Sequence, residues 1–154
     1  MISHYEKSVV SCSPDSLFAV ILDIESYPKF VPGWHAAHIR SQEKDRLIVE
    51  QQLGIGPVYW TFTSSAFYRK PEQVIIRSHD GPFKKLEINW KLANAGENRC
   101  SVELHIHAEF SALVPQKLIK PLLKISARNV ISLFEERVLS GVNRTLDPDP
   151  HKGH

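Results

Sequence analysis

The sequence lacks long apolar runs, and it contains only two cysteines, Cys12 and Cys100. A helix that spans a membrane needs about 20 consecutive apolar residues, and the longest unbroken run here is a few residues long. Two cysteines at this distance fit neither a disulfide framework nor a zinc ribbon. The first residues also lack a basic segment followed by an apolar one. We therefore expect a soluble protein in a reducing, cytoplasmic compartment, at most peripheral to the inner membrane.

The sequence also lacks a charge excess that would indicate a nucleic-acid partner. Lys and Arg number 19 and Asp and Glu number 17, which gives a formal net charge of +2. No DNA partner is expected. The length of 154 residues suits one domain, which we predict over residues 1–145. Residues 146–154 contain no apolar anchor after Leu146 and are predicted to form a disordered tail.

The N-terminal quarter of the chain predicts one strand and one helix. Residues 4–10 suit a short strand. Ser13 is expected to cap a helix, with Pro14 at the first helical position and Asp15 favoured by the helix dipole. Proline-containing pairs predict that this helix ends between Asp23 and Tyr27.

From His35 to Phe110 the apolar residues alternate with polar ones, in six segments separated by turn residues. The clearest segment places Leu86, Ile88, Trp90 and Leu92 on one face. In another segment, alternate apolar residues are expected to face inward, and the side chains between them, including His105 and His107, to face solvent. The inward residues are Cys100, Val102, Leu104, Ile106, Ala108 and Phe110. Such alternation indicates an antiparallel sheet with one solvated face.

After Ser111 the apolar period returns to that of a helix, and we predict about 25 helical residues ending near Gly141, with a kink or break at Pro121. Its apolar side is expected to hold Leu118, Ile119, Leu122, Val130, Leu133 and Phe134. The predicted fold class is therefore α+β, with a curved antiparallel sheet of about seven strands wrapped around a long C-terminal helix.

Four strings of residues resemble the START-like, helix-grip superfamily, and within it the coenzyme Q-binding and ribosome association toxin (RatA) group. The resemblance spans about residues 3–140, and the strings that carry it are Asp23–Pro32, Phe62–Ser64, Asp80–Leu86 followed by Trp90, and Phe134–Arg137. The resemblance implies a helix-grip fold that holds a hydrophobic ligand, ubiquinone in one branch, between the sheet and the long helix. It also implies delivery of that lipid for respiration or quinone biosynthesis. One departure is the string Pro32–His35, which lacks the cysteine that the family often has there.

The expected cavity and lid combine the segment from Tyr27 to Trp34, the strand from Val58 to Tyr68, the next apolar strand and the long helix. Taken singly, each of these side chains is more often ordinary core, and only the resemblance and the curved sheet favour a cavity for the set. The segment from Tyr27 to Trp34 could be a lid, or a loop pinned by its own hydrophobic residues. The candidate ligand-binding residues are Tyr27, Phe30, Val31, Trp34, Val58, Trp60, Phe62, Ser64, Tyr68, Ile88, Trp90, Leu122, Val130 and Phe134.

No motif for nucleophilic or nucleotide chemistry is present, so we expect no catalytic residues and no catalytic cofactor. The inward polar groups are predicted to be Ser64, Tyr68, Ser78 and Asn129, with no carboxylate or histidine base among them. These groups could hydrogen-bond a quinone carbonyl. A polyketide cyclase or aromatase is an alternative. No metal site is expected, because His105 and His107 share the solvated face.

Basic residues of the C-terminal helix are predicted to lie in one stripe, with two further lysines near the sheet turn. The stripe could be a solvated face, or it could dock on anionic lipid or on ribosomal RNA. These residues are Lys84, Lys85, Lys117, Lys120, Lys124 and Arg128. The alternative function is thus a toxin-like protein that binds the large ribosomal subunit and blocks subunit association. Arg137 is expected to pair with a carboxylate.

Overall fold

A computed structural model describes residues 1–123 and 125–145, and within these all side chains but those of residues 55, 121–123 and 142–145. The predicted tail, Lys124 and the side chain of Leu122 therefore lie outside the described residues. No helix among the described residues is long and apolar enough to cross a membrane.

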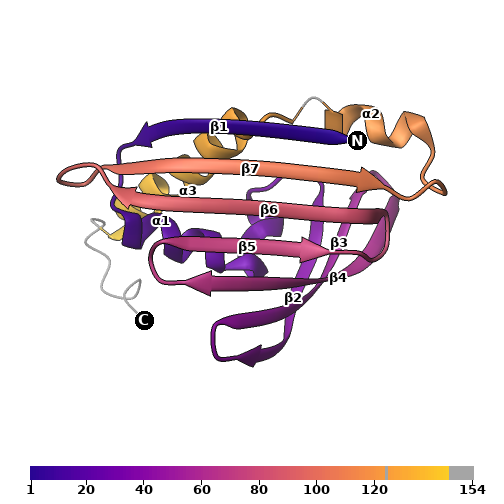
Figure 1. Cartoon of the computed structure of the whole chain (residues 1–154), viewed down its shortest axis with the longest axis horizontal. Coiled ribbons are helices and arrows are strands. Elements are labelled where there is room, and N and C mark those ends of the chain that lie inside the picture. The colour runs from indigo at the N-terminus through magenta and orange to yellow at the C-terminus, as the bar shows by residue number, and fades with distance from the viewer. Residues whose placement is uncertain (124, 146–154) are drawn as a thin grey trace.

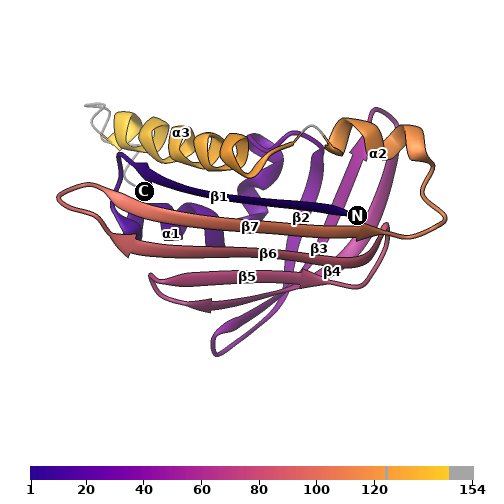
Figure 2. The same cartoon turned by 45° about the horizontal axis from the view of Figure 1, so that its top comes forward.

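Seven strands form one antiparallel sheet in the order β1-β7-β6-β5-β4-β3-β2 (Figure 1). The six strands predicted between His35 and Phe110 are confirmed. The sheet curves so that helices cover its concave side (Figure 2). The strands are β1 (Ile2–Val10), β2 (Trp34–Glu43), β3 (Arg46–Ile55), β4 (Val58–Arg69), β5 (Gln73–Ser78), β6 (Phe83–Asn94) and β7 (Cys100–Phe110).

The first helix, α1 (Pro14–Leu22), begins where the sequence predicts. Ser13 Oγ accepts a hydrogen bond from the backbone N–H of Ser16 at 3.2 Å, and Pro14 occupies the first turn. Its buried side chains pack towards the sheet, and a 3-10 helix, η1 (Ile24–Lys29), follows directly. The chain therefore reaches the edge strand β2 through a helical turn.

The C-terminal segment forms two helices, α2 (Gln116–Leu123) and α3 (Ala127–Thr145). The expected kink or break is a break into a short first helix and a longer second one, but it lies after Pro121 rather than at it, and the second helix ends at Thr145 rather than near Gly141. Pro121 lies within α2, and the new helix starts because Ser126 Oγ accepts from the backbone N–H of Asn129 at 3.2 Å. This capping serine is the sequence signal for the break.

Helix α3 covers one end of the sheet, where the main core lies. The side chains of Ala127, Ile131, Phe134 and Val138 are buried in it, at the spacing of one helix face. They meet α1 and the inward residues of β1, β6 and β7. Val130 and Leu133 lie beside this face and are only half-buried. The predicted apolar side was misplaced because the helical period was continued from α2 into α3, although these are two separate helices.

The turn between β5 and β6 is held against β4. Asp80 Oδ2 accepts a hydrogen bond from the backbone N–H of Thr63 at 2.9 Å. Gly81 has φ +62°, and a Cβ there would lie 2.7 Å from the Cβ of Phe62. Glycine is required by both the conformation and the close approach. This turn fixes the start of β6 beside Phe62, which matters for the site below.

Candidate functional site: an apolar cavity between sheet and helix

A cavity of about 370 Å³ lies on the concave side of the sheet, bounded by the first part of α3. This volume is at the lower end of the roughly 300–1,000 Å³ of typical small-molecule sites. All seven strands contribute to its wall, which is apolar apart from a few side chains. Eight of the predicted ligand-binding residues line it: Tyr27, Val31, Trp34, Phe62, Ile88, Trp90, Val130 and Phe134.

Strand alternation does not explain why five other predicted ligand-binding residues lie outside this wall. They are Phe30, Val58, Trp60, Ser64 and Tyr68. Val58 is exposed at the start of β4. Trp60 lines a separate space of about 10 Å³ beside Val114 and Leu118. Phe30 packs behind the wall, with its ring centroid 5.1 Å from that of Phe134.

The hydroxyl residues proposed to face a ligand are engaged elsewhere in the core. Ser64 accepts a hydrogen bond from Gln51, and the Tyr68 ring packs edge-on to Phe18 at 6.3 Å. Ser78 Oγ donates to the carbonyl oxygen of Thr63 at 2.7 Å. Of the predicted inward polar groups, only Asn129 reaches the cavity wall.

Many wall residues were absent from the predicted set, although the alternation already placed several of them inward. Leu86, Ile106, Ala108 and Phe110 have the predicted orientation, but they line the cavity rather than pack beneath a helix. Nothing in their own spacing distinguishes the two outcomes. The other wall residues absent from the set are Ile2, His4, Pro32, Gln51, Leu53, Ile76, Phe83, Ile125 and Leu133.

The segment from Tyr27 to Trp34 is both part of the wall and anchored to the core. The Tyr27 ring lies edge-on to those of Trp34 and Phe134, at 6.1 and 5.4 Å between centroids. Its hydroxyl donates to the carbonyl oxygen of Ile21, and burial raises the pKa of that hydroxyl. Arg137 holds the same cluster from outside, with Cζ 5.1 Å from the Phe30 ring centroid. The predicted carboxylate partner of Arg137 is not found among the described residues.

Two wall residues belong to a buried polar chain. Trp34 Nε1 donates to Gln51 Oε1 at 2.7 Å, and Gln51 Nε2 donates to Ser64 Oγ. Gln51 and Ser64 are each 2% exposed. Because these hydrogen-bonding atoms already have partners, they fix the wall and leave little capacity for a ligand.

His4 is a wall residue as well, which corrects the expectation that no histidine faces the interior. Its Nε2 is buried and has no hydrogen-bond partner within the described part of the chain. Leaving such an atom unpaired costs about 1–3 kcal/mol. The inward position of His4 could have been predicted from the sequence, because strand alternation places Ile2, His4 and Val10 on the same face of β1.

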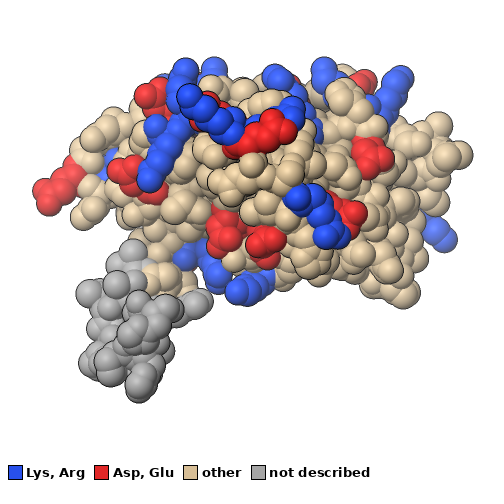
Figure 3. Space-filling view, turned by 90° about the horizontal axis from the view of Figure 1, so that it is seen from below, with Lys and Arg blue, Asp and Glu red and all other residues tan. Residues whose placement is uncertain are grey.

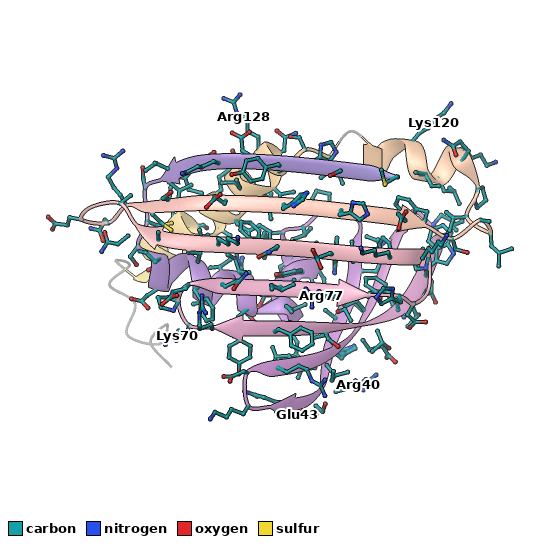
Figure 4. All side chains as sticks on the ribbon, in the orientation of Figure 1. Arg40, Glu43, Lys70, Arg77, Lys120 and Arg128 are labelled. Atoms are coloured by element: carbon teal, nitrogen blue, oxygen red, sulfur yellow. The ribbon has the colours of Figure 1, made fainter. Side chains whose placement is uncertain are left out.

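The predicted basic residues do not form one helical stripe. Lys117 and Lys120 are exposed on α2, whereas Arg128 is exposed at the start of α3, a separate helix. Figure 4 shows Lys120 and Arg128 pointing away from the fold at separate places. Lys84 and Lys85 are exposed at the start of β6, the strand end nearest α2 in Figure 1. Another face, seen in Figure 3, carries basic and acidic side chains interspersed.

The outer face of the sheet holds the histidines that were predicted to be solvated. His105 is exposed, and His107 Nε2 lies 3.9 Å from Glu109 Oε2. Within residues 1–123 and 125–145, no three His, Cys, Asp or Glu side chains are grouped as metal ligands.

Residues 10–135 match the family described as polyketide cyclase / dehydrase and lipid transport. The chain belongs to this family. The same fold is present in a START superfamily protein from Mycobacterium smegmatis, which superposes with a TM-score of 0.73 at 18% identity, over 90% of this chain and 97% of that one.

Two similar proteins differ in the roles that their names state. The ribosome association toxin RatA of Escherichia coli is 25% identical over 84% of this chain and 82% of its own. The mitochondrial coenzyme Q-binding protein COQ10 homolog B of Xenopus laevis is 23% identical over 88% of this chain and 57% of its own.

Proposed function

We propose that this protein is a non-catalytic carrier that holds ubiquinone or a similar lipid in the cavity and delivers it for respiration or quinone biosynthesis. The apolar cavity of about 370 Å³ under α3 carries the proposal. Each buried methylene contributes roughly 0.8 kcal/mol, so a prenyl tail would gain most of its affinity from such a wall. The similarity to COQ10 favours a quinone.

The polar lining favours binding over catalysis. His4 is the one histidine of the wall, and no carboxylate lines the cavity among the described residues. General acid–base chemistry depends on a titratable group that a second group orients. A polyketide cyclase, the enzymatic alternative, would need such a pair facing its substrate.

Release of the ligand would involve the segment from Tyr27 to Trp34. Val31, Pro32 and Trp34 contribute wall, and the proline limits the conformational freedom that closure would remove. The aromatic contacts of Tyr27 make this segment an anchored part of the wall rather than a free loop.

The test compares lipid content between variants purified from a quinone-producing host. Ala108→Phe adds a ring into the cavity, and Ala93→Phe adds the same ring at an exposed position of β6. Organic extraction and mass spectrometry should find quinone with the wild type and with Ala93→Phe, and at least about tenfold less with Ala108→Phe. A folded wild type that is empty and takes up no added ubiquinone contradicts the proposal.

A second candidate function is binding to the large ribosomal subunit, which the similarity to RatA supports. Exposed lysines on α2 and at the start of β6 offer cations for RNA phosphates. These lysines are Lys84, Lys85, Lys117 and Lys120; Lys124, outside the described residues, was predicted with them.

Co-sedimentation with purified large subunits tests this candidate. Lys117→Glu combined with Lys120→Glu should weaken binding by about tenfold or more, with a smaller dependence on salt. Lys44→Glu combined with Lys91→Glu makes the same charge change at exposed positions elsewhere. Equal binding by both double variants would argue against these lysines as the ribosomal contact.

A further inference from the structure

At one end of the molecule, two connections between strands and helices expose apolar residues to water. They are the turn between β3 and β4 and the loop between β7 and α2. Residues 56–59 and 112–115 contain no charged side chain, whereas each of the other four hairpin turns of the sheet contains at least one. Leu113 is 91% exposed and Val58 is 44% exposed. We call Pro57, Val58, Leu113 and Pro115, all of them exposed, the apolar tip.

The two connections pack against each other, so the apolar tip has a fixed shape. Val114 and Trp60, one from each side, line the same small space of about 10 Å³. The backbone N–H of Ser111 donates to the carbonyl oxygen of Pro82 at 2.9 Å, and that of Leu113 donates to Ser111 Oγ at 3.3 Å. Val114 is therefore buried while Leu113 faces solvent. A backbone held in this way loses little conformational freedom on binding.

Exposed lysines flank the apolar tip and outnumber the carboxylates beside it. Two lysines start β6 and two lie on α2, where Figure 4 shows Lys120 pointing away from the fold. Two carboxylates lie among them: Asp80 accepts from the backbone N–H of Thr63, and Glu109 pairs with Lys85 across the sheet. An apolar centre with a basic rim results. The lysines are Lys84, Lys85, Lys117 and Lys120.

The apolar tip also lies next to the cavity. Leu53 and Phe110 line both the cavity and the small space beside Val114. These two side chains therefore stand between the cavity and the connections that carry the tip. Figure 2 shows the loop between β7 and α2 projecting beyond the sheet at this end. A surface that contacts the tip is thus brought close to the cavity.

We propose that this end of the protein docks on a bilayer that contains anionic lipids, with Leu113 and Val58 entering the acyl boundary and the flanking lysines contacting headgroups. The inference rests on the proposed function, because it states the surface from which the carrier loads and delivers its lipid. Apolar side chains gain from contact with hydrocarbon and not from contact with RNA phosphates, so the tip favours a bilayer over the ribosome. Each lysine near an anionic surface adds up to about fivefold in affinity.

The experiment is flotation of the full chain with two kinds of vesicle, phosphatidylcholine alone and phosphatidylcholine mixed with phosphatidylglycerol. Leu113→Asp should weaken binding to the mixed vesicles at least about tenfold. Leu139→Asp, the same change at a position 38% exposed on α3, should alter it less than about twofold. Lys117→Glu combined with Lys120→Glu should weaken binding to the mixed vesicles about tenfold or more, with a smaller change on phosphatidylcholine alone.

A fluorescent label reports whether the tip enters the bilayer. Leu113→Cys and Leu139→Cys each add one exposed thiol, while the native Cys12 and Cys100 are buried and react slowly. A nitrobenzoxadiazole label at position 113 should brighten and shift to shorter wavelength with the mixed vesicles, and the label at position 139 should not. Because the Leu113 side chain is exposed, its variants should keep the melting temperature of the wild type.

The outcomes separate this inference from the proposed function. If the wild type retains quinone but does not float with the mixed vesicles, or if both aspartate variants weaken flotation equally, the docking surface is overturned and the carrier function stands. Vesicle binding at Leu113 by a chain that takes up no quinone supports the docking surface and contradicts the carrier function. If purified large ribosomal subunits are bound and no vesicles are, the lysines contact RNA and the docking surface is overturned.

Discussion

Two ends of the same sheet differ in what covers their inward faces. On β7, Cys100, Val102 and Leu104 are 0% exposed under α1 and α3, and we call this the packed end. Further along the same strand, Ile106 and Phe110 are half-buried and line the cavity, which we call the cavity end. Figure 2 shows α3 over the first and α2 near the second.

The difference shows that one continuous alternating pattern of apolar residues can form both close-packed core and the wall of a cavity. Helix α3 begins at Ala127 and fills the space above the packed end. Its first turns instead present Val130 and Leu133 to the cavity, and Trp90 and Phe134 belong to both the core and the wall. Close packing gives way to open space where the two C-terminal helices separate.

The largest expected contrast is between neighbouring inward residues of β7. Leu104→Ala should lower the free energy of unfolding by about 2–5 kcal/mol, because it opens a cavity in close-packed core. Ile106→Ala should cost less than half as much, since this side chain already faces open space. Urea denaturation of both variants measures the contrast, and equal losses would contradict the distinction between the two ends.

A smaller effect is expected from the polar chain behind the cavity wall. Gln51→Leu removes the partners of Trp34 Nε1 and Ser64 Oγ, and should lower the free energy of unfolding by about 1–3 kcal/mol. Tryptophan fluorescence should shift as Trp34 loosens. The control Gln52→Leu changes the neighbouring side chain, which makes no such bonds. A loss no greater than that of the control would show that the chain does not hold the wall.

The smallest effect concerns the pH dependence of the packed end. Burial, followed by the nearby Cys100 and Glu135, raises the pKa of the Cys12 thiol to about 11 from its ordinary value of 9.0. Between these pH values the unfolded chain releases this proton and the folded chain keeps it, so stability falls as pH rises from 9 to 11.

Unfolding free energies measured by urea at pH 8 and pH 10 should therefore differ more for the wild type than for Cys12→Ala. Iodoacetamide at pH 8 should modify Cys12 at least about tenfold more slowly in the folded chain than in urea. Rapid modification of the folded chain would mean that this end opens readily.

Much of the fold could be predicted from local patterns. The helix cap at Ser13, the six strands from β2 to β7 and the inward face of β7 all follow from short-range chemistry. The site was predictable only in part. Val58 and Trp60 share the parity of Phe62, yet Val58 is exposed, Trp60 lines the small space beside Val114 and Leu118, and Phe62 lines the cavity.

The break in the C-terminal segment was expected at Pro121, whereas the second helix starts after Ser126. A proline inside a helix need not end it, whereas a serine whose hydroxyl caps a new helix does mark a start. Continuing one helical period across both helices also placed Lys117 and Arg128 in a single predicted basic stripe, although they lie on different helices.

By itself, the sequence determined which residues of β6 and β7 face inward, because the strand period depends only on neighbouring residues. It also determined where α1 begins, through the chemistry of its cap. Only the tertiary structure decided which inward residues are covered by a helix and which surround a cavity, since this depends on contacts between segments far apart in the chain. The same long-range packing buried Nε2 of His4, a residue of the cavity wall, without a hydrogen-bond partner among the described residues.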